Sequence, residues 1–272
     1  MSVALLTSGA AYADRVLLAL GMAGVEVDAV LVVDARPRGR GGWRRAASAT
    51  AKRPRTVAAA AAGRARSMLE GGGAQRWAGL AREVHRVGPL NGEEMLGRLR
   101  ALAPDHLLLA SVGIVGAEAL GAVRLATLNA HPALLPWAPG LGVVERSLQR
   151  AVPVGASVHL VDAGVDTGAI VRRELVPALP LDTLGSLRAK AQERAALLLA
   201  QVVAEAPPRE PPAAVAQPER WPACDWPPRE EVARLEAEIR GGLAVRLYEE
   251  WSAFYGGMEL PAAEVRSPAV VG

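Results

Sequence analysis

The chain has 272 residues, of which 51% are apolar and 22% are charged, and its formal net charge is +3. This is the composition of a folded globular protein, and it excludes a mainly disordered chain. The single cysteine, Cys224, excludes an internal disulfide and a thiolate metal cluster. We find neither a run of 18 apolar residues nor a signal peptide, so we expect a cytoplasmic protein without a membrane-spanning helix.

Residues 3–33 predict a β-α-β unit. Val3–Ser8 is a short apolar run typical of a buried strand, Asp14–Ala23 carries leucines at helical spacing, and Val25–Val33 is a second apolar run. Two strands joined by a helix imply a right-handed crossover and a parallel sheet.

A strongly basic segment follows this unit. Residues 36–66 contain ten Arg and Lys residues and no Asp or Glu. Such a segment is either a solvated part of the surface or a patch for phosphate groups or nucleic acid. Its Ala-rich centre, Val57–Ala62, favours a helix.

Strands and helices continue to alternate along the chain. We predict helices over Glu93–Leu102 and Asp182–Ala204, with Thr183 as the N-cap of the second, and strands over His106–Ser111, Leu125–His131 and Gly155–Val161. This alternation predicts an α/β fold class, a Rossmann-like and mostly parallel sheet with helices on both faces.

The composition changes after Glu205. Eight prolines fall between positions 207 and 228, a density that no regular element tolerates, so we predict a crossing loop or linker over 206–228. A last helix is predicted over Arg229–Glu250, which Gly241 and Gly242 can interrupt, and a tail over 261–272. We therefore divide the chain into one large domain at residues 1–205 and a Pro-rich linker with a small C-terminal helical extension at 206–272.

Two polar side chains lie at the end of one predicted strand. Asn129 and His131 are two residues apart, so the period of a strand points both to the same face. Pro132 and Pro136 then end the strand and stiffen the loop that follows. A carboxamide beside an imidazole can form an oxyanion site, or it can be a buried polar pair.

An acidic residue flanked by glycines follows the next strand. Gly164 and Gly168 lie on either side of Asp166, so the backbone can turn tightly and come close to a ligand. Asp166 can act as a base or orient a histidine, or it can cap the turn. His159, on the preceding strand, is interpreted either as a core residue or as a residue on the substrate side.

Three segments together resemble the folate-dependent formyltransferase family. They are PDHLLLASVGIV at Pro104–Val115, NAHPALLP at Asn129–Pro136 with Gly140 beyond it, and SVHLVDAGVDTGAI at Ser157–Ile170. This family includes glycinamide ribonucleotide transformylase, methionyl-tRNA formyltransferase and the sugar N-formyltransferases. One departure is Ala133, where many members carry Ser. The resemblance covers Pro104–Ala204 well and residues 3–33 more loosely.

The resemblance implies that Asn129, His131 and Asp166 are the catalytic residues of an N-formyltransferase. Asn129 and a protonated His131 would then stabilise the oxyanion that forms when an amine attacks a formyl carbon. Asp166 would orient His131, keep it charged and help to move the amine proton. A carboxylate beside an imidazole raises its pKa, so we expect a raised pKa for His131.

The resemblance also implies a co-substrate, N10-formyltetrahydrofolate, and no metal. Its pterin ring would lie in an apolar slot and bond to main-chain groups of two segments. The residues that would bind it are Leu109, Ala110, Ser111, Val112, Gly113, Ile114 and Val115 in the first segment, and Val161, Asp162, Ala163, Gly164 and Val165 in the second.

We expect the acceptor to be a small-molecule amine such as an amino sugar, an amino acid or a biosynthetic intermediate. It can also carry a phosphate or be bound to a carrier. The turn at residues 8–13 lacks the Gly- and Asn-rich phosphate turn of the ribonucleotide enzymes and contains Tyr12 instead. The segment after Ala204 is too short and too Pro-rich for a tRNA-binding β-barrel.

Other interpretations stay open. The chain can be a methionyl-tRNA formyltransferase-like enzyme with a reduced C-terminal domain, or a non-catalytic folate-binding or interaction module. Nucleic-acid binding through residues 36–66 is a further alternative, and the C-terminal segment can serve a homodimer interface.

Overall fold

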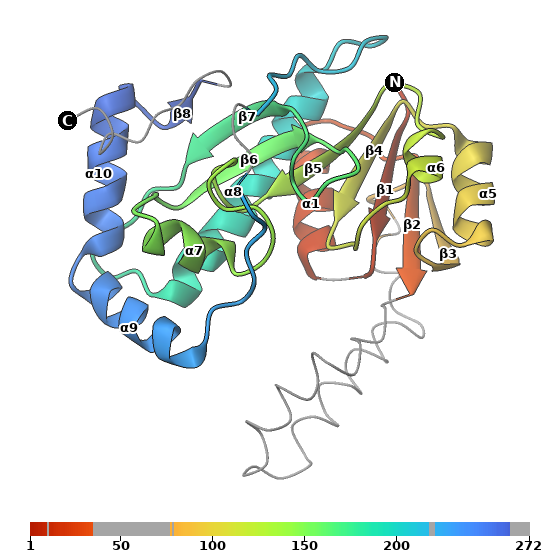
Figure 1. Cartoon of the computed structure of the whole chain (residues 1–272). Coiled ribbons are helices and arrows are strands. Elements are labelled where there is room, and N and C mark those ends of the chain that lie inside the picture. The colour runs from red at the N-terminus through yellow and green to blue at the C-terminus, as the bar shows by residue number, and fades with distance from the viewer. Residues whose placement is uncertain (10, 35–76, 78, 218–220, 262–272) are drawn as a thin grey trace, which may run out of the picture.

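The computed structural model describes residues 1–9, 11–34, 77, 79–217 and 221–261, and these residues form one eight-stranded sheet flanked by helices (Figure 1). The strand order is β3-β2-β1-β4-β5-β6-β7-β8. The strands are β1 (Val3–Thr7), β2 (Ala29–Asp34), β3 (Glu83–Pro89), β4 (His106–Ala110), β5 (Ala126–His131), β6 (Gly155–Leu160), β7 (Ile170–Leu175) and β8 (Glu259–Leu260).

The first five strands run parallel and the rest antiparallel. β1 pairs in parallel with both β2 and β4, so the chain leaves β1 on one side and returns on the other. β6 pairs antiparallel with β5 and continues the sheet to β7. The predicted fold class, a mostly parallel Rossmann-like sheet, is confirmed. The point between β1 and β4 is a topological switch, where ligands bind in such sheets.

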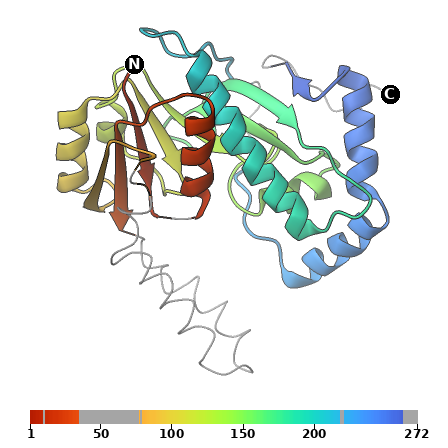
Figure 2. The ribbon, with the colours of Figure 1, turned by 180° about the vertical axis from the view of Figure 1, so that it is seen from behind.

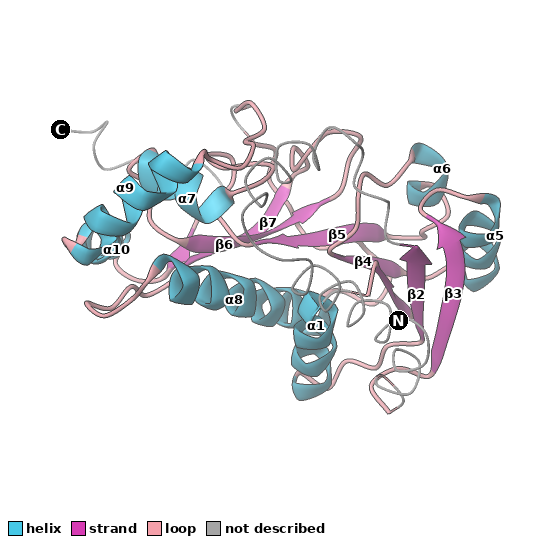
Figure 3. Cartoon of the chain, turned by 90° about the horizontal axis from the view of Figure 1, so that it is seen from below, coloured by secondary structure: helices cyan, strands magenta, loops and turns pink. Residues whose placement is uncertain are grey.

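Helices cover both faces of the sheet (Figures 2 and 3). α1 (Ala11–Met22) and α8 (Leu184–Glu205) pack on one face, and α5 (Glu93–Leu102) and α6 (Ala117–Leu120) pack on the other. Alternate residues of β1 divide between the two cores, with Leu5 in the first and Leu6 in the second. The predicted cap is confirmed, because the Thr183 side chain accepts the Ser186 backbone N–H at the start of α8.

The C-terminal extension packs on the antiparallel side of the sheet. α9 (Arg229–Arg240) and α10 (Leu243–Tyr255) share an apolar core with α7 (Val143–Gln149) and α8. The predicted helical break at Gly241 and Gly242 is confirmed. β8 then pairs with β7 and completes the sheet. Among the helices in the described part of the chain, none is long and apolar enough to cross a membrane.

Several elements differ from the sequence-based predictions. β3 and β7 were not predicted, because EVHRVGP and IVRREL contain charged residues and lack the apolar run of a central strand. α7 has only seven residues, too few for a helical period to stand out. The second strand begins at Ala29 rather than Val25. The predictions for the basic segment, including Val57–Ala62, and for the tail at 262–272 lie outside the described residues.

A buried histidine at the start of β4 is expected to make the fold sensitive to acid. The His106 side chain is completely buried, and burial lowers its pKa below the ordinary value of 6.5 despite the opposing charge of Asp105. Below pH 6.5 the unfolded chain therefore binds a proton that the folded chain resists, so stability is lost as the pH falls.

We expect His106→Leu to flatten this pH dependence. One histidine that stays neutral in the folded state can account for up to about 1.4 kcal/mol between pH 7.5 and 5.5. Urea denaturation at both pH values measures the difference. An unchanged slope in the variant would show that His106 is not the acid-sensitive group.

Candidate functional site

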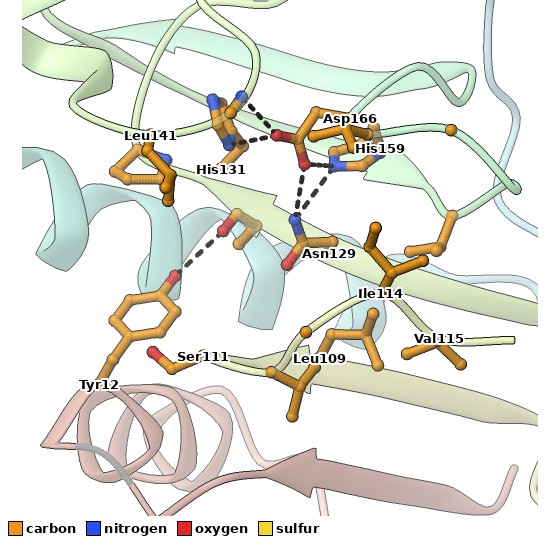
Figure 4. A pocket seen from close by; sticks show the side chains of 18 of the residues that line it. Tyr12, Leu109, Ser111, Ile114, Val115, Asn129, His131, Leu141, His159 and Asp166 are labelled. Atoms are coloured by element: carbon orange, nitrogen blue, oxygen red, sulfur yellow. Dashed lines mark hydrogen bonds and ion pairs between the residues drawn. The ribbon is translucent and has the colours of Figure 1, made fainter. Parts of the chain in front are cut away.

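A cavity of about 400 Å³ lies at the carboxyl ends of β1, β4 and β5, at the topological switch (Figure 4). The loops after β4, β5 and β6 contribute to its wall, together with one side chain each of α1 and α8. Ser8, directly after β1, joins its own loop to the loop after β4, since its Oγ donates to the Ser111 carbonyl at 2.6 Å. The volume lies in the range of pockets that hold small molecules.

β5 brings Asn129 and His131 into this cavity. The two side chains lie on the same face of the strand, as the period of two predicts, while Leu128 and Ala130 between and beside them join the core under α8. His131 is only 4% exposed. Its Nε2 donates to the Ala138 carbonyl at 2.7 Å, and since a carbonyl only accepts, this assigns the ring proton to Nε2.

Asp166 is the hub of the polar cluster. Its Oδ2 accepts the Gly140 backbone N–H at 2.9 Å and lies 3.5 Å from Nδ1 of His131. Its Oδ1 lies 3.5 Å from Nδ2 of Asn129 and 3.5 Å from Nε2 of His159. The structure therefore brings together the three residues singled out in the sequence, from β5 and from the loop after β6 (Figure 4).

His159 belongs to the same cluster. It is 2% exposed, as a core residue would be, but it also lies at the cavity wall. Its Nδ1 donates to the Leu160 carbonyl at 2.8 Å, which leaves Nε2 to accept the Asn129 amide at 3.1 Å. His159 thus orients Asn129. The second hydrogen on the Asn129 amide has only the 3.5 Å contact to Asp166, so it can turn to a ligand oxygen.

The electrostatics of the cluster keep Asp166 ionised. Burial by itself would raise the pKa of the Asp166 carboxyl, but the Coulombic effect of His131 and His159 in their protonated forms and the hydrogen bond from the Gly140 N–H outweigh it. The net result holds its pKa well below the ordinary value. Asp166 is therefore a poor proton acceptor at neutral pH and is suited to a fixed negative charge.

The pKa of His131 is lowered, which corrects the expectation of a raised value. Burial disfavours the charged ring, and the charge of Asp166 and the hydrogen bond to Ala138 oppose this effect without reversing it. The sequence places a carboxylate near the ring but does not reveal that the ring is almost completely enclosed. We therefore expect a neutral His131 at neutral pH, with the free lone pair on Nδ1.

Most of the residues assigned to a folate site line the cavity. They are Leu109, Ser111, Val112, Gly113, Ile114, Val115, Val161, Asp162, Gly164 and Val165. Ala110 and Ala163 do not line it. Ala110 lies on the opposite face of β4 and is buried in the core beneath α1 and α8, and the side chain of Ala163 points to solvent.

The cavity also has residues that sequence reasoning missed. Tyr12 comes from the first turn of α1, Leu141 from the loop before α7, and Gln192 from α8. Of these three residues, only Tyr12 stood out in the sequence. It is an aromatic residue in a turn where the enzymes that bind a ribonucleotide phosphate have small residues. Among the described residues, no group of three or more His, Cys, Asp or Glu side chains is arranged to hold a metal ion.

Comparison with known proteins decides the family. The family model described as "Formyl transferase" matches residues 1–203. The chain belongs to the formyl transferase family. The resemblance inferred from the three sequence segments is therefore confirmed.

The chain is similar to curated relatives of two different kinds within this family. It is 35% identical over 130 residues to a methionyl-tRNA formyltransferase of Aromatoleum aromaticum, a match that covers 47% of this chain and 40% of the relative. It is 47% identical over 105 residues to a phosphoribosylglycinamide formyltransferase of Mycobacterium tuberculosis, covering 37% of this chain and 48% of the relative. The matches thus span less than half the length of either relative.

Solved structures agree on the fold. A glycinamide ribonucleotide transformylase from Symbiobacterium toebii matches with a TM-score of 0.53 and 22% identity, covering 80% of this chain and 94% of that chain. A 4-N formyltransferase from Francisella tularensis matches with a TM-score of 0.53 and 14% identity, covering 82% and 76%. At such identities the likeness concerns the fold alone.

Proposed function

We propose that this formyl transferase moves a formyl group from N10-formyltetrahydrofolate to the amine of a small-molecule or carrier-bound acceptor. The observation that carries the proposal is the convergence of Asn129 and His131 of β5 with Asp166 of the loop after β6 at one cavity. The folate segments predicted from the sequence supply most of the remaining wall. The cavity is lined by apolar side chains and main-chain groups, which suits a flat ring with polar edges.

The chemistry needs one proton transfer and one charge to be stabilised. A bond forms between the acceptor nitrogen and the formyl carbon, the bond from that carbon to N10 breaks, and a proton passes from the acceptor nitrogen to N10. The free hydrogen of the Asn129 amide can donate to the formyl oxygen as it becomes negative, an interaction worth about 3–4 kcal/mol in comparable sites.

In the proton transfer, His131 carries the proton and Asp166 stabilises the positive charge that results. The lone pair on Nδ1 of His131 can take the amine proton, directly or through a water, because burial leaves the ring neutral. Once Nδ1 carries the proton it faces the ionised Asp166 carboxylate 3.5 Å away, and this pairing stabilises the imidazolium. The imidazolium then stabilises the nearby oxyanion by its positive charge, and it can deliver the proton to N10.

The wall around Tyr12 and Leu141 indicates how an acceptor would enter. None of the described residues that line the cavity is Lys or Arg, and its acidic members are Asp162 and Asp166. Burial raises the pKa of Tyr12 above its ordinary value, so the phenol stays neutral. This lining favours an acceptor that presents its amine to the cavity.

A second candidate is a methionyl-tRNA formyltransferase-like activity with a reduced C-terminal domain. The relative from Aromatoleum aromaticum favours it, since the match covers 47% of this chain. A non-catalytic folate-binding module is the third candidate. The clustered polar side chains argue against it, because a binding slot alone has no need of a partly buried acid between two imidazoles.

One assay separates the candidates. The protein is mixed with N10-formyltetrahydrofolate and single acceptors, and release of tetrahydrofolate is followed. The acceptors are amino sugars and their nucleotide conjugates, amino acids, glycinamide ribonucleotide and methionyl-tRNA. We expect turnover with a small amine. Turnover with methionyl-tRNA only would support the second candidate, and saturable folate binding without turnover would support the third.

A further inference from the structure

Part of the C-terminal extension lies against both loops that form the polar cluster. We call residues 213–217 and 221–227 the strap. Its residue Val215 forms an antiparallel bridge with Ile170, with both N–H···O distances at 2.8 Å. Ile170 begins β7 directly after the loop of Asp166, so the bridge fixes the register of the strap against that loop.

Gln217 then bonds to the backbone of the Asp166 loop itself. Its Nε2 donates to the Asp166 carbonyl and to the Gly168 carbonyl, both at 2.8 Å. Both partners only accept, so the amide orientation is fixed by chemistry, and both of its hydrogens are used. One side chain of the extension thus clamps the carbonyls on either side of Thr167.

The backbone of Asp166 adopts a conformation that these hydrogen bonds help to hold. Its φ is +54°, in the left-handed region that few non-glycine residues adopt, Asp and Asn among them. The rest of the loop is held from inside, since Asp162 accepts hydrogen bonds from the Gly164 N–H and the Thr167 hydroxyl. Gln217 adds hydrogen bonds to the backbone of this loop from another part of the chain.

The strap also holds the partner of the Asp166 carboxylate. The Cys224 N–H donates to the Pro139 carbonyl at 2.7 Å, and the Leu141 N–H donates to the Cys224 carbonyl at 3.0 Å. These bonds bracket Gly140, whose own N–H donates to Asp166. The approach is so close that a Cβ on Gly140 would lie 2.5 Å from the Cys224 carbonyl oxygen.

We propose that Gln217 is a positioning residue of the formyl-transfer site, which acts through Asp166, and that the strap is therefore part of the active site rather than an appendage. The proposal rests on the proposed function. In this proposal, two sets of contacts from the extension hold the Asp166 carboxylate in position. One set is made to the backbone of the Asp166 loop, and the other to the loop of Gly140.

The test compares Gln217→Met with Gln201→Met. Met keeps the volume of Gln and removes both donors, and Gln201 is an exposed residue of α8 away from the cluster. We expect Gln217→Met to lower kcat about 10- to 100-fold, with KM for the formyl donor within about threefold, as supporting contacts of reactive groups do. Gln217→Lys, which restores donors, should recover most of the lost kcat.

Hydrogen exchange gives a readout that does not need turnover. In Gln217→Met the amides of residues 162–169 should exchange faster, and in Gln201→Met they should not. A Gln217→Met variant with kcat within twofold of wild type would overturn the proposal. So would a loss of kcat that follows the melting temperature and is not recovered by Gln217→Lys.

The two proposals fail in different ways. If the wild-type protein turns over no amine, the proposed function fails, and the exchange comparison alone then decides the role of the strap. Faster exchange at 162–169 in Gln217→Met supports a clamp on the Asp166 loop, and unchanged exchange overturns it. If the wild type is active and Gln217→Met is equally active, only the strap proposal fails.

Discussion

Asp166→Asn is expected to lower kcat by about 10³-fold or more while leaving the fold intact. The substitution removes the negative charge that would face a protonated Nδ1 of His131, 3.5 Å away. A comparable loss of an orienting carboxylate beside a catalytic histidine costs about 10⁴-fold. Asn tolerates the left-handed backbone of this position as well as Asp does, so the loop has no reason to move.

The pH profile of the same variant tests the assigned protonation state. Because His131 must be neutral to take the amine proton, kcat/KM of the wild type should fall only as the pH drops through a His131 pKa below 6.5. Without the Asp166 charge, nothing but the Ala138 hydrogen bond opposes burial, so the acid limb should move to lower pH.

Glu236→Gln on the exposed face of α9 is the matched control, since it replaces a carboxylate by an amide far from the cluster. It should keep wild-type kcat and the wild-type pH profile. Residual activity of Asp166→Asn within tenfold of wild type would contradict the role of Asp166. An acid limb that moves to higher pH would contradict a neutral His131.

The candidate site was largely foreseeable because its central residues lie on regular features. A strand period of two places Asn129 and His131 on one face of the strand. The glycines around Asp166 indicate a loop whose backbone can come close to a ligand. These are local properties, and the structure agrees with them.

The remainder of the site depends on packing between distant segments. Tyr12, Leu141 and Gln192 reach the cavity from α1, the loop before α7 and α8, and no local pattern reports which helix face lies over a strand end. Burial is equally invisible in the sequence, so the pKa of His131 was predicted in the wrong direction. The Pro-rich segment was expected to cross the protein, but its density of prolines says nothing of what Gln217 contacts.

Gly168→Ala is expected to lower kcat about 100-fold and to destabilise the protein by about 1–3 kcal/mol. A Cβ at this position would lie 1.8 Å from the Leu160 carbonyl oxygen and 2.8 Å from its carbon. Both atoms are backbone of β6, which pairs with strands on either side and cannot yield, so the loop must move instead. A shift of about 1 Å at a reacting group is enough for a loss of this size.

Gly97→Ala supplies the contrast that isolates this cause. Gly97 lies within α5, and a Cβ there meets no atom within 4 Å, so the same substitution should stabilise the helix by about 0.5–1 kcal/mol and leave kcat unchanged. Urea denaturation and steady-state rates on the two variants give both quantities. Wild-type kcat in Gly168→Ala would mean that the position of Asp166 tolerates displacement of its loop, and that formyl transfer does not depend on the geometry of this carboxylate.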